Sequence, residues 1–169
     1  GVANIRLYNN TVYTNPGVTT SGTVLAWGDV AGCSNNLIQA SIYNNIFNVT
    51  ETQDGYSVFN TNYNPSSTII SDYNIWNGSG GGLPSWHGTH DVIADPLFAD
   101  LAGGDFRPKS NYAIGAGTSA LPVRALVRRD LAGFSRPKNI NSDRGFDIGA
   151  LQYNTNPILP KAPYLHPGP

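Results

Sequence analysis

The chain has 169 residues, enough to bury one hydrophobic core, and its formal net charge is −1. Only 12% of the residues are charged, so its polarity comes from amides and hydroxyls, including 19 Asn residues. Its single cysteine, Cys33, excludes an internal disulfide and a CxxC-type metal site, and no apolar run approaches the roughly 18 residues of a membrane-spanning helix.

The charge is unevenly distributed. Residues 1–106 contain one cation, Arg6, and eight acidic residues, which gives a net charge of −7. The remaining residues contain nine cations and three acidic residues, which gives a net charge of +6. Each half could simply be solvated, or one end of the molecule could attract the opposite end of a neighbour. The chain does not begin with Met, so we also expect a processed or partial product.

An internal repeat covers the first part of the chain. Three segments have the sequences LYNNTVY, IYNNIF and SDYNIW and start at residues 7, 42 and 71. Each ends in Asn, an aliphatic and an aromatic residue in that order, with Thr11 inserted after the Asn of the first. Further apolar runs lie between them at 23–27 and 56–59. The runs are short, rich in β-branched and aromatic residues, and bounded by Asn, Gly, Pro and Ser, which predicts an all-β solenoid.

Asn is suited to the tight corners of such a solenoid, because it tolerates left-handed backbone angles and bonds to its own turn. Stacked coils place equivalent residues next to one another. We therefore expect an amide ladder and an inner aliphatic stack, formed respectively by Asn10, Asn45 and Asn74 and by Val12, Ile46 and Ile75.

Beyond the Gly-rich run 78–82, five motifs follow in order: DPLFAD from 95, GDFRP from 104, AIGAG from 113, DLAGFSRP from 130 and DIGA from 147. This series resembles the C-terminal region of secreted right-handed parallel β-helix proteins of the choice-of-anchor Q domain type, which are similar to the pectate-lyase-like superfamily. The departures are Asn111-Tyr112-Ala113, where that family has Ser-Pro-Ala, and Gln152 in place of Glu. The resemblance implies a fold and an extracellular or cell-surface address, but no reaction.

We predict three regions: parallel β-helix coils, about three in number, over residues 1–100, a loop-rich capping segment over 101–153, and an extended Pro-rich tail over 154–169. In the cap, Asp130 and Asp147 are predicted to pair with nearby arginines and fasten the loops over the last coil. Alternatively, the arginines bind acidic polysaccharide, because guanidinium groups fit carboxylates. These candidate residues are Arg124, Arg128, Arg129, Arg136 and Arg144.

Two further sets of residues are candidate sites. His87, His90 and Asp91 could hold a transition metal, although packing of this Gly-rich loop against Trp86 is the favoured interpretation. No cofactor is expected. Three Asn-x-Ser/Thr sequons mark glycosylation candidates, and the corresponding residues are Asn9, Asn48 and Asn77.

Catalysis within this chain is not favoured. The resemblance implies that a polysaccharide lyase would need a Lys or Arg base on the sheet, and the coils offer only Arg6. The sequence also places no second acid near Asp72 for glycoside hydrolysis. No catalytic residue is therefore assigned, and a lyase or hydrolase site would lie outside these residues.

The leading hypothesis is an extracellular structural module that self-assembles, or associates with a surface, through its uncapped N-terminal coil and C-terminal arm. The alternative is the C-terminal fragment of a polysaccharide-binding or polysaccharide-cleaving β-helix. The expected partners are copies of the chain, another extracellular chain or a polysaccharide, with no nucleic acid and no membrane span.

Overall fold

The computed structural model describes residues 2–14, 23–26, 37–49, 57–60, 66–78, 82–120, 122–136 and 145–153. Within them the regular secondary structure is almost entirely β-strand, with a single four-residue helix, α1 (Val123–Leu126). The strands are β1 (Val2–Tyr8), β2 (Thr11–Thr14), β3 (Thr23–Ala26), β4 (Leu37–Tyr43), β5 (Ile46–Val49), β6 (Ser57–Asn60), β7 (Thr68–Asp72), β8 (Ile75–Asn77), β9 (Val92–Ile93), β10 (Phe98–Asp100) and β11 (Asp105–Pro108).

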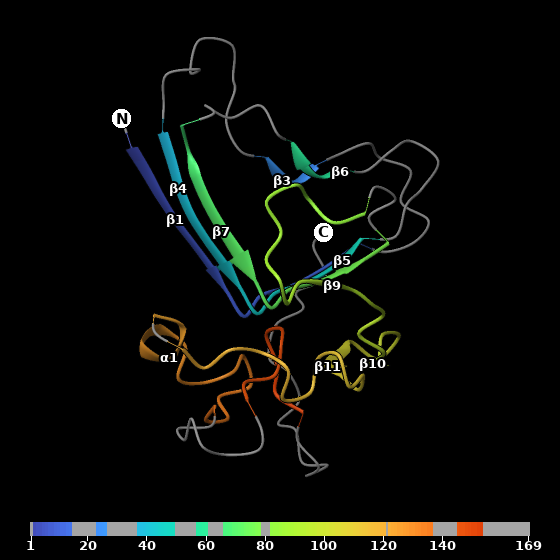
Figure 1. The fold of residues 1–169 in the computed structure, drawn as a ribbon. Helices are drawn as coiled ribbons and strands as arrows, with labels where there is room; N and C mark the ends of the chain where they lie inside the picture. The colour runs from blue at the N-terminus through green and yellow to red at the C-terminus, as the bar shows by residue number, and fades with distance from the viewer. Residues whose placement is uncertain are drawn as a thin grey trace, which may run out of the picture.

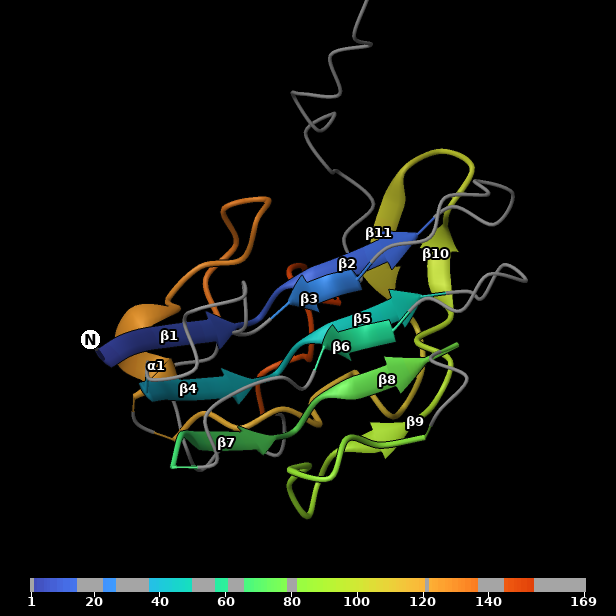
Figure 2. The same ribbon diagram turned by 90° about the horizontal axis from the view of Figure 1, so that it is seen from above.

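The described residues form four sheets, of which three are parallel. Their strand orders are β1-β4-β7, β2-β5-β8-β9 and β3-β6, and only β10-β11 is antiparallel. Figure 1 shows that the first two sheets meet at a bend while β3 and β6 lie apart from it, and Figure 2 shows equivalent strands side by side. An all-β chain whose successive segments return to pair in parallel is compatible with a β-solenoid.

The predicted Asn ladder is confirmed. The main-chain N–H and the side-chain amide of Asn10 both donate to Oδ1 of Asn45, each at 2.9 Å. The same two groups of Asn45 donate to Oδ1 of Asn74 at 2.9 and 2.8 Å. Since Asn45 and Asn74 are fully buried, these bonds remove the cost of leaving amides unpaired in the interior.

The predicted inner stack of Val12, Ile46 and Ile75 is wrong, because Ile46 and Ile75 point to the outer face of the sheet, whereas Val12 packs against the inner core. Thr11, not Val12, is in register with Ile46 and Ile75. Val12 instead aligns with Phe47 and Trp76. The two rows point to opposite faces of the sheet, because side chains alternate along a strand.

The two faces of this sheet are covered by separate cores. On the inner face, Ala40, Ile42, Phe47, Val49 and Trp76 form a buried cluster, in which the Phe47 and Trp76 rings stack 4.4 Å apart. On the outer face, Ile46 and Ile75 pack against Ala113 and Ile148 from the C-terminal segment. Burial on both faces explains why all four residues of β5 are buried.

Gly149 allows the C-terminal segment to approach this outer face closely. Its φ is +101°, and a Cβ there would lie 2.7 Å from Cδ1 of Ile46 and 2.8 Å from Oγ1 of Thr11. The main-chain N–H of Ala150 also donates to Oγ1 of Thr11 at 3.0 Å. A side chain at position 149 would therefore push the segment off the sheet.

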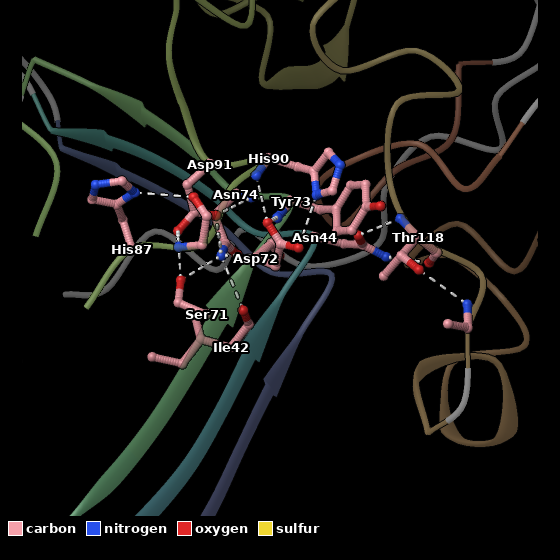
Figure 3. A network of polar contacts seen from close by, with 12 residues as sticks. Ile42, Asn44, Ser71, Asp72, Tyr73, Asn74, His87, His90, Asp91 and Thr118 are labelled. Atoms are coloured by element: carbon pink, nitrogen blue, oxygen red, sulfur yellow. Dashed lines mark hydrogen bonds and ion pairs between the residues drawn. The ribbon is translucent and has the colours of Figure 1, made fainter. Parts of the chain in front are cut away.

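The left-handed corner position lies one residue before the ladder. Asn9, Asn44 and Tyr73 have φ of 54°, 58° and 59°. The first two also bind the C-terminal segment: Asn9 donates to the carbonyl oxygen of Asp147 at 3.0 Å, and Asn44 exchanges two 2.8 Å bonds with the main chain of Thr118 (Figure 3). The corners thus attach the coils to the segment that covers them.

Among the described residues, no helix is long and apolar enough to cross a membrane. Cys33, Arg144 and the Pro-rich tail lie outside the described residues.

Candidate functional site

The outer face of the β1-β4-β7 sheet presents three rows of side chains in register. Alternation along the strands directs Ile5, Leu7, Ala40, Ile42 and Ile69 to the inner core. The intervening residues point outward and are exposed or half-buried. Their rows are Asn4–Gln39–Thr68, Arg6–Ser41–Ile70 and Tyr8–Tyr43–Asp72.

The third row combines two aromatic rings with a carboxylate. The rings of Tyr8 and Tyr43 lie 5.9 Å apart, tilted by 55°. Burial raises the pKa of the Tyr43 hydroxyl, and the charge of Asp72 raises it further. The end of this sheet therefore places one carboxylate beside two tyrosine rings.

Asp72 holds a histidine at the edge of this row (Figure 3). Oδ2 of Asp72 lies 2.9 Å from Nδ1 of His90, while Oδ1 accepts the main-chain N–H groups of His90 and Tyr73 at 2.6 and 3.1 Å. The imidazole also stacks on the ring of Tyr73, with centroids 4.2 Å apart and planes 8° apart. These contacts fix the orientation of a side chain that remains 54% exposed.

His87, His90 and Asp91 do not come together as a ligand set. Asp91 is buried and accepts bonds from Ser71, Asn74 and Gly88, whereas His90 pairs with Asp72 and His87 approaches the carbonyl oxygen of Gly88. Within the described ranges, no group of three or more His, Cys, Asp or Glu side chains could hold a metal. The same loop does pack through Trp86, whose ring lies edge-on to Trp76 at 6.1 Å.

Among the candidate anion-binding arginines, Arg136 is turned inward. It is 2% exposed and donates to the carbonyl oxygens of Asp147, Gly149 and Ala150 and to Oε1 of Gln152. Burial lowers its pKa to about 10, although the charges of Asp130 and Asp147 act in the opposite direction. Arg136 therefore fastens the cap and does not present its guanidinium group to an anion.

The other three candidate arginines that the structure describes lie on the cap. Arg128 and Arg129 are exposed and Arg124 is half-buried. Nη1 of Arg129 donates to the carbonyl oxygen of Gly133 at 2.7 Å. Asp130 accepts main-chain N–H groups from Phe134 and Gln152. The predicted fastening of the cap thus relies, within the described residues, on Arg136 and main-chain groups.

Two of the three sequon asparagines are buried. Asn9 donates to the C-terminal segment, and Asn48 accepts a 2.9 Å bond from the side-chain amide of Asn77. The third, Asn77, is half-buried, and its side-chain nitrogen is the donor of the hydrogen bond to Asn48. A glycan is attached to the side-chain nitrogen, so at Asn9 it would disturb the hydrogen bond to the C-terminal segment, and at Asn48 it would require a buried side chain to leave its place.

Comparison with known proteins identifies the family. A family model described as "Disaggregatase related" matches residues 26–125, well over half of the chain. The chain belongs to the disaggregatase-related family. No curated protein and no solved structure matches it. The resemblance to choice-of-anchor Q proteins stays a prediction.

The match to the disaggregatase-related family includes β4, β7 and the His90 loop, but not β1. The sequence reasoning had not identified Tyr43, Asp72 and Gln39 of this disaggregatase-related protein as one surface. The available signal was the alternation of polar and apolar residues from Gln39 to Ile42 in LIQASIY. TIISD gives no such signal, because the apolar Ile70 is exposed and the polar Ser71 is buried.

Proposed function

We propose that this chain is a segment of an extracellular right-handed parallel β-helix of about three coils, which binds polysaccharide on the outer face of β1-β4-β7. The family description, "Disaggregatase related", supports a role connected with the dispersal of aggregates. The repeated ladder at residues 10, 45 and 74 supports the coil count. No reaction is assigned to the chain.

The observation that carries this proposal is the register of the outward rows. Amide groups recur in the first row, on Asn4 and Gln39, and phenol groups in the third, on Tyr8 and Tyr43, on adjacent strands about 4.8 Å apart. Hydroxyl groups of Thr68 and Ser41 and the guanidinium group of Arg6 lie in the same rows, beside the apolar Ile70. Amide and hydroxyl groups both donate and accept, as sugar hydroxyls do. Aromatic rings such as Tyr43 offer an apolar wall for the C–H face of a pyranose.

The charges on this face favour a neutral glycan over a polyuronate. Arg6 is the only cation in the three rows, whereas Asp72 raises the pKa of Tyr43 through its negative charge. A uronate carboxylate near the third row would be repelled by Asp72. The bound polysaccharide is therefore expected to present hydroxyl or N-acetyl groups to this row.

Affinity electrophoresis of the full chain tests the proposal. Gels containing neutral glucans, galactans or N-acetylhexosamine polymers are compared with gels containing pectate or alginate. At least one neutral polymer should retard the protein. Gln39→Ala and Tyr43→Ala should each reduce the retardation, because each removes one position from the rows.

Tyr112→Ala is the matched control, since Tyr112 is an exposed tyrosine of the C-terminal segment and lies outside the rows. Thermal unfolding of each variant shows whether lost retardation reflects lost folding. The proposal fails if folded Gln39→Ala and Tyr43→Ala bind as the parent does. Binding only to polyuronates, abolished by Arg128→Ala with Arg129→Ala, would move the site to the cap.

Self-assembly is the second candidate function. Among the described strands, β1 and β2 are the outermost members of their sheets and leave an edge that could template another chain. The opposite net charges of the two halves favour contacts between unlike ends. Negative-stain electron microscopy tests this candidate: filaments that shorten in high salt would support it, and single particles at every concentration would refute it.

A further inference from the structure

The imidazole of His90 is held from two sides although it is exposed. One carboxylate oxygen of Asp72, Oδ2, lies 2.9 Å from its Nδ1, and the ring of Tyr73 stacks on it with centroids 4.2 Å apart. The other oxygen, Oδ1, accepts the main-chain N–H of His90 at 2.6 Å, so the backbone beneath the ring is fixed as well (Figure 3). The protein alone therefore sets both the position and the orientation of this ring.

The sequence departs from its own repeat at this corner. The three corner residues that precede the ladder have left-handed φ angles, and the first two are Asn9 and Asn44, whereas the third is Tyr73 at 59°. Asn adopts this conformation more readily than a bulky aromatic residue does, so Tyr73 costs stability there. The ring of Tyr73 is the face on which His90 stacks. An unfavourable residue is thus used where its side chain supports the imidazole, as happens at functional sites.

Asp72 decides which ring nitrogen of His90 carries the proton. A carboxylate only accepts hydrogen bonds, so Nδ1 is the protonated nitrogen of the neutral imidazole. The second nitrogen, Nε2, then has a free lone pair, and within the described part of the chain no hydrogen bond reaches it. Figure 3 shows it on the side of the ring away from Asp72. His90 therefore offers an outward acceptor whose direction is fixed.

This acceptor extends the third outward row of the β1-β4-β7 sheet. Asp72 is the last member of the row Tyr8–Tyr43–Asp72, and His90 is attached to it. Both carboxylate oxygens of Asp72 are engaged by His90 and by the main chain. The row thus runs from two phenol rings across a carboxylate to the Nε2 lone pair, which is the acceptor that the imidazole adds at this end.

We propose that Nε2 of His90 binds ligand by accepting a hydrogen bond from a hydroxyl group of a neutral glycan lying along the third row. The proposal rests on the polysaccharide binding proposed above and adds the loop between β8 and β9 to that site. Asp72 is a positioning residue, since it sets the tautomer and the direction of the ring. Carboxylate and sulfate groups have no proton to give to Nε2 and face the charge of Asp72, so the same arrangement excludes anionic sugars.

The tautomer can be tested without a ligand. Oδ1 of Asp72 accepts two main-chain N–H groups, so in Asp72→Asn the new amide keeps its oxygen there and turns its nitrogen toward Nδ1. That nitrogen donates, so the ring proton moves to Nε2. Nitrogen NMR at about pH 8.5, where imidazoles are generally neutral, reports the protonated nitrogen. We expect Nδ1 in the parent and Nε2 in Asp72→Asn, and a proton on Nε2 of the parent would overturn the inference.

Binding is tested with His90→Asn in affinity gels of the neutral polymers. The amide nitrogen replaces Nδ1 and keeps the hydrogen bond to Asp72, but no atom remains at the position of Nε2. The apparent Kd should rise about 2- to 10-fold, while the thermal midpoint stays within about 3 °C of the parent. His87→Asn is the matched control, because His87 is exposed in the same loop and lies outside the row. Equal retardation of the parent and His90→Asn would overturn the inference.

A gain of binding provides a second test that unfolding cannot imitate. Asp72→Asn removes a negative charge and turns Nε2 into a donor, so this variant should be retarded more than the parent by pectate or alginate. Adding His90→Asn to Asp72→Asn keeps the change in charge and removes the new donor. The double variant should therefore bind the polyuronate about 2- to 10-fold more weakly than Asp72→Asn alone. Equal binding by these two variants would show that Nε2 does not face the ligand, and would overturn the inference.

The results also separate this inference from the proposed function. If Gln39→Ala and Tyr43→Ala reduce the retardation by a neutral polymer and His90→Asn does not, polysaccharide binding is supported and the role of His90 fails. If no neutral polymer retards the parent, the proposed function fails and the inference fails with it.

Discussion

Asp91 receives two bonds from Asn74 through one oxygen, with the main-chain N–H at 2.7 Å and the side-chain amide at 2.9 Å. Its other oxygen binds Ser71 and Gly88, so a single buried carboxylate joins the last corner to the loop that follows it. The stability of the last coil should therefore depend strongly on this side chain.

Replacing Asp91 should destabilise the protein in a graded way. Asp91→Asn keeps Oδ1 as an acceptor but replaces Oδ2 by an amide nitrogen, which cannot accept the hydrogen bond from the Gly88 N–H. We therefore expect the unfolding free energy to fall by about 1–3 kcal/mol. Asp91→Ala leaves all four donors without their acceptor and should cost more than Asp91→Asn. Urea denaturation measures both. Asp100→Asn, at an exposed position on β10, should change stability by at most about 1 kcal/mol, and equal losses at both sites would contradict the assignment.

Gly88→Ala should detach the His90 loop. A Cβ at this position would lie 2.0 Å from the carbonyl oxygen of Ser71 and 2.6 Å from Oδ1 of Asp72. The sheet holds Ser71 in place, so the loop must move, at a cost of about 1–3 kcal/mol. Nitrogen NMR of the His90 ring should show loss of the Nδ1–Asp72 hydrogen bond. Thr89→Ala, at an exposed position in the same loop, should preserve that signal, and an unchanged signal in Gly88→Ala would refute the contact.

Gln152 should be replaceable by Glu but not by Ala. Its Oε1 accepts from Nη1 of Arg136 at 2.5 Å and from the main-chain N–H of Asp147 at 3.0 Å. Gln152→Ala leaves a buried guanidinium short of an acceptor, at a cost of about 1–3 kcal/mol. Gln152→Glu retains the acceptor and adds a counter-charge, so it should unfold at or above the midpoint of the parent. Differential scanning calorimetry separates the two, and equal destabilisation would mean that the amide nitrogen matters as well.

The Asp105–Arg107 pair should contribute to stability only above moderately acidic pH. The hydrogen bond from Arg107 lowers the pKa of Asp105 below 3.8, so the folded state binds the proton less well than the unfolded chain. The contribution is therefore complete above that value and is lost as the pH falls from 3.8 through the lower folded pKa. It should amount to at most about 1 kcal/mol, since the pair is near the surface. Unfolding from pH 6 to pH 2 should show a shallower pH dependence in Asp105→Asn than in the parent, with Asp95→Asn as the exposed control.

The ladder could be predicted because its signal is local. Each Asn stands directly before an apolar strand, and stacking equivalent corners is a geometric consequence of a repeat. The predicted inner stack failed because the prediction followed hydrophobicity: Thr11, not Val12, is aligned with Ile46 and Ile75, and this row faces outward, toward the C-terminal segment. Counting positions from Asn10 would have given the register that the structure has.

Asp91 was missed for a different reason. It was considered as a metal ligand beside two histidines, yet it precedes Val92-Ile93 just as each ladder Asn precedes its strand. Its interval of 17 residues from Asn74 is too short to match the repeat. The pairing of Asp72 with His90 depends on how that shortened loop folds back, and no sequence period encodes it.

The contacts of Asn9 with Asp147 join positions 138 residues apart. On a ribosome, the coils would therefore emerge long before Ile148, which covers Ile46 and Ile75. The outer face of the sheet would remain partly exposed to solvent until the DIGA motif is made. Contacts of such long range are associated with slow folding. The order of synthesis thus makes closure of the outer core a late event. A nascent chain that stops before residue 148 would expose apolar side chains of this face, which a chaperone could bind.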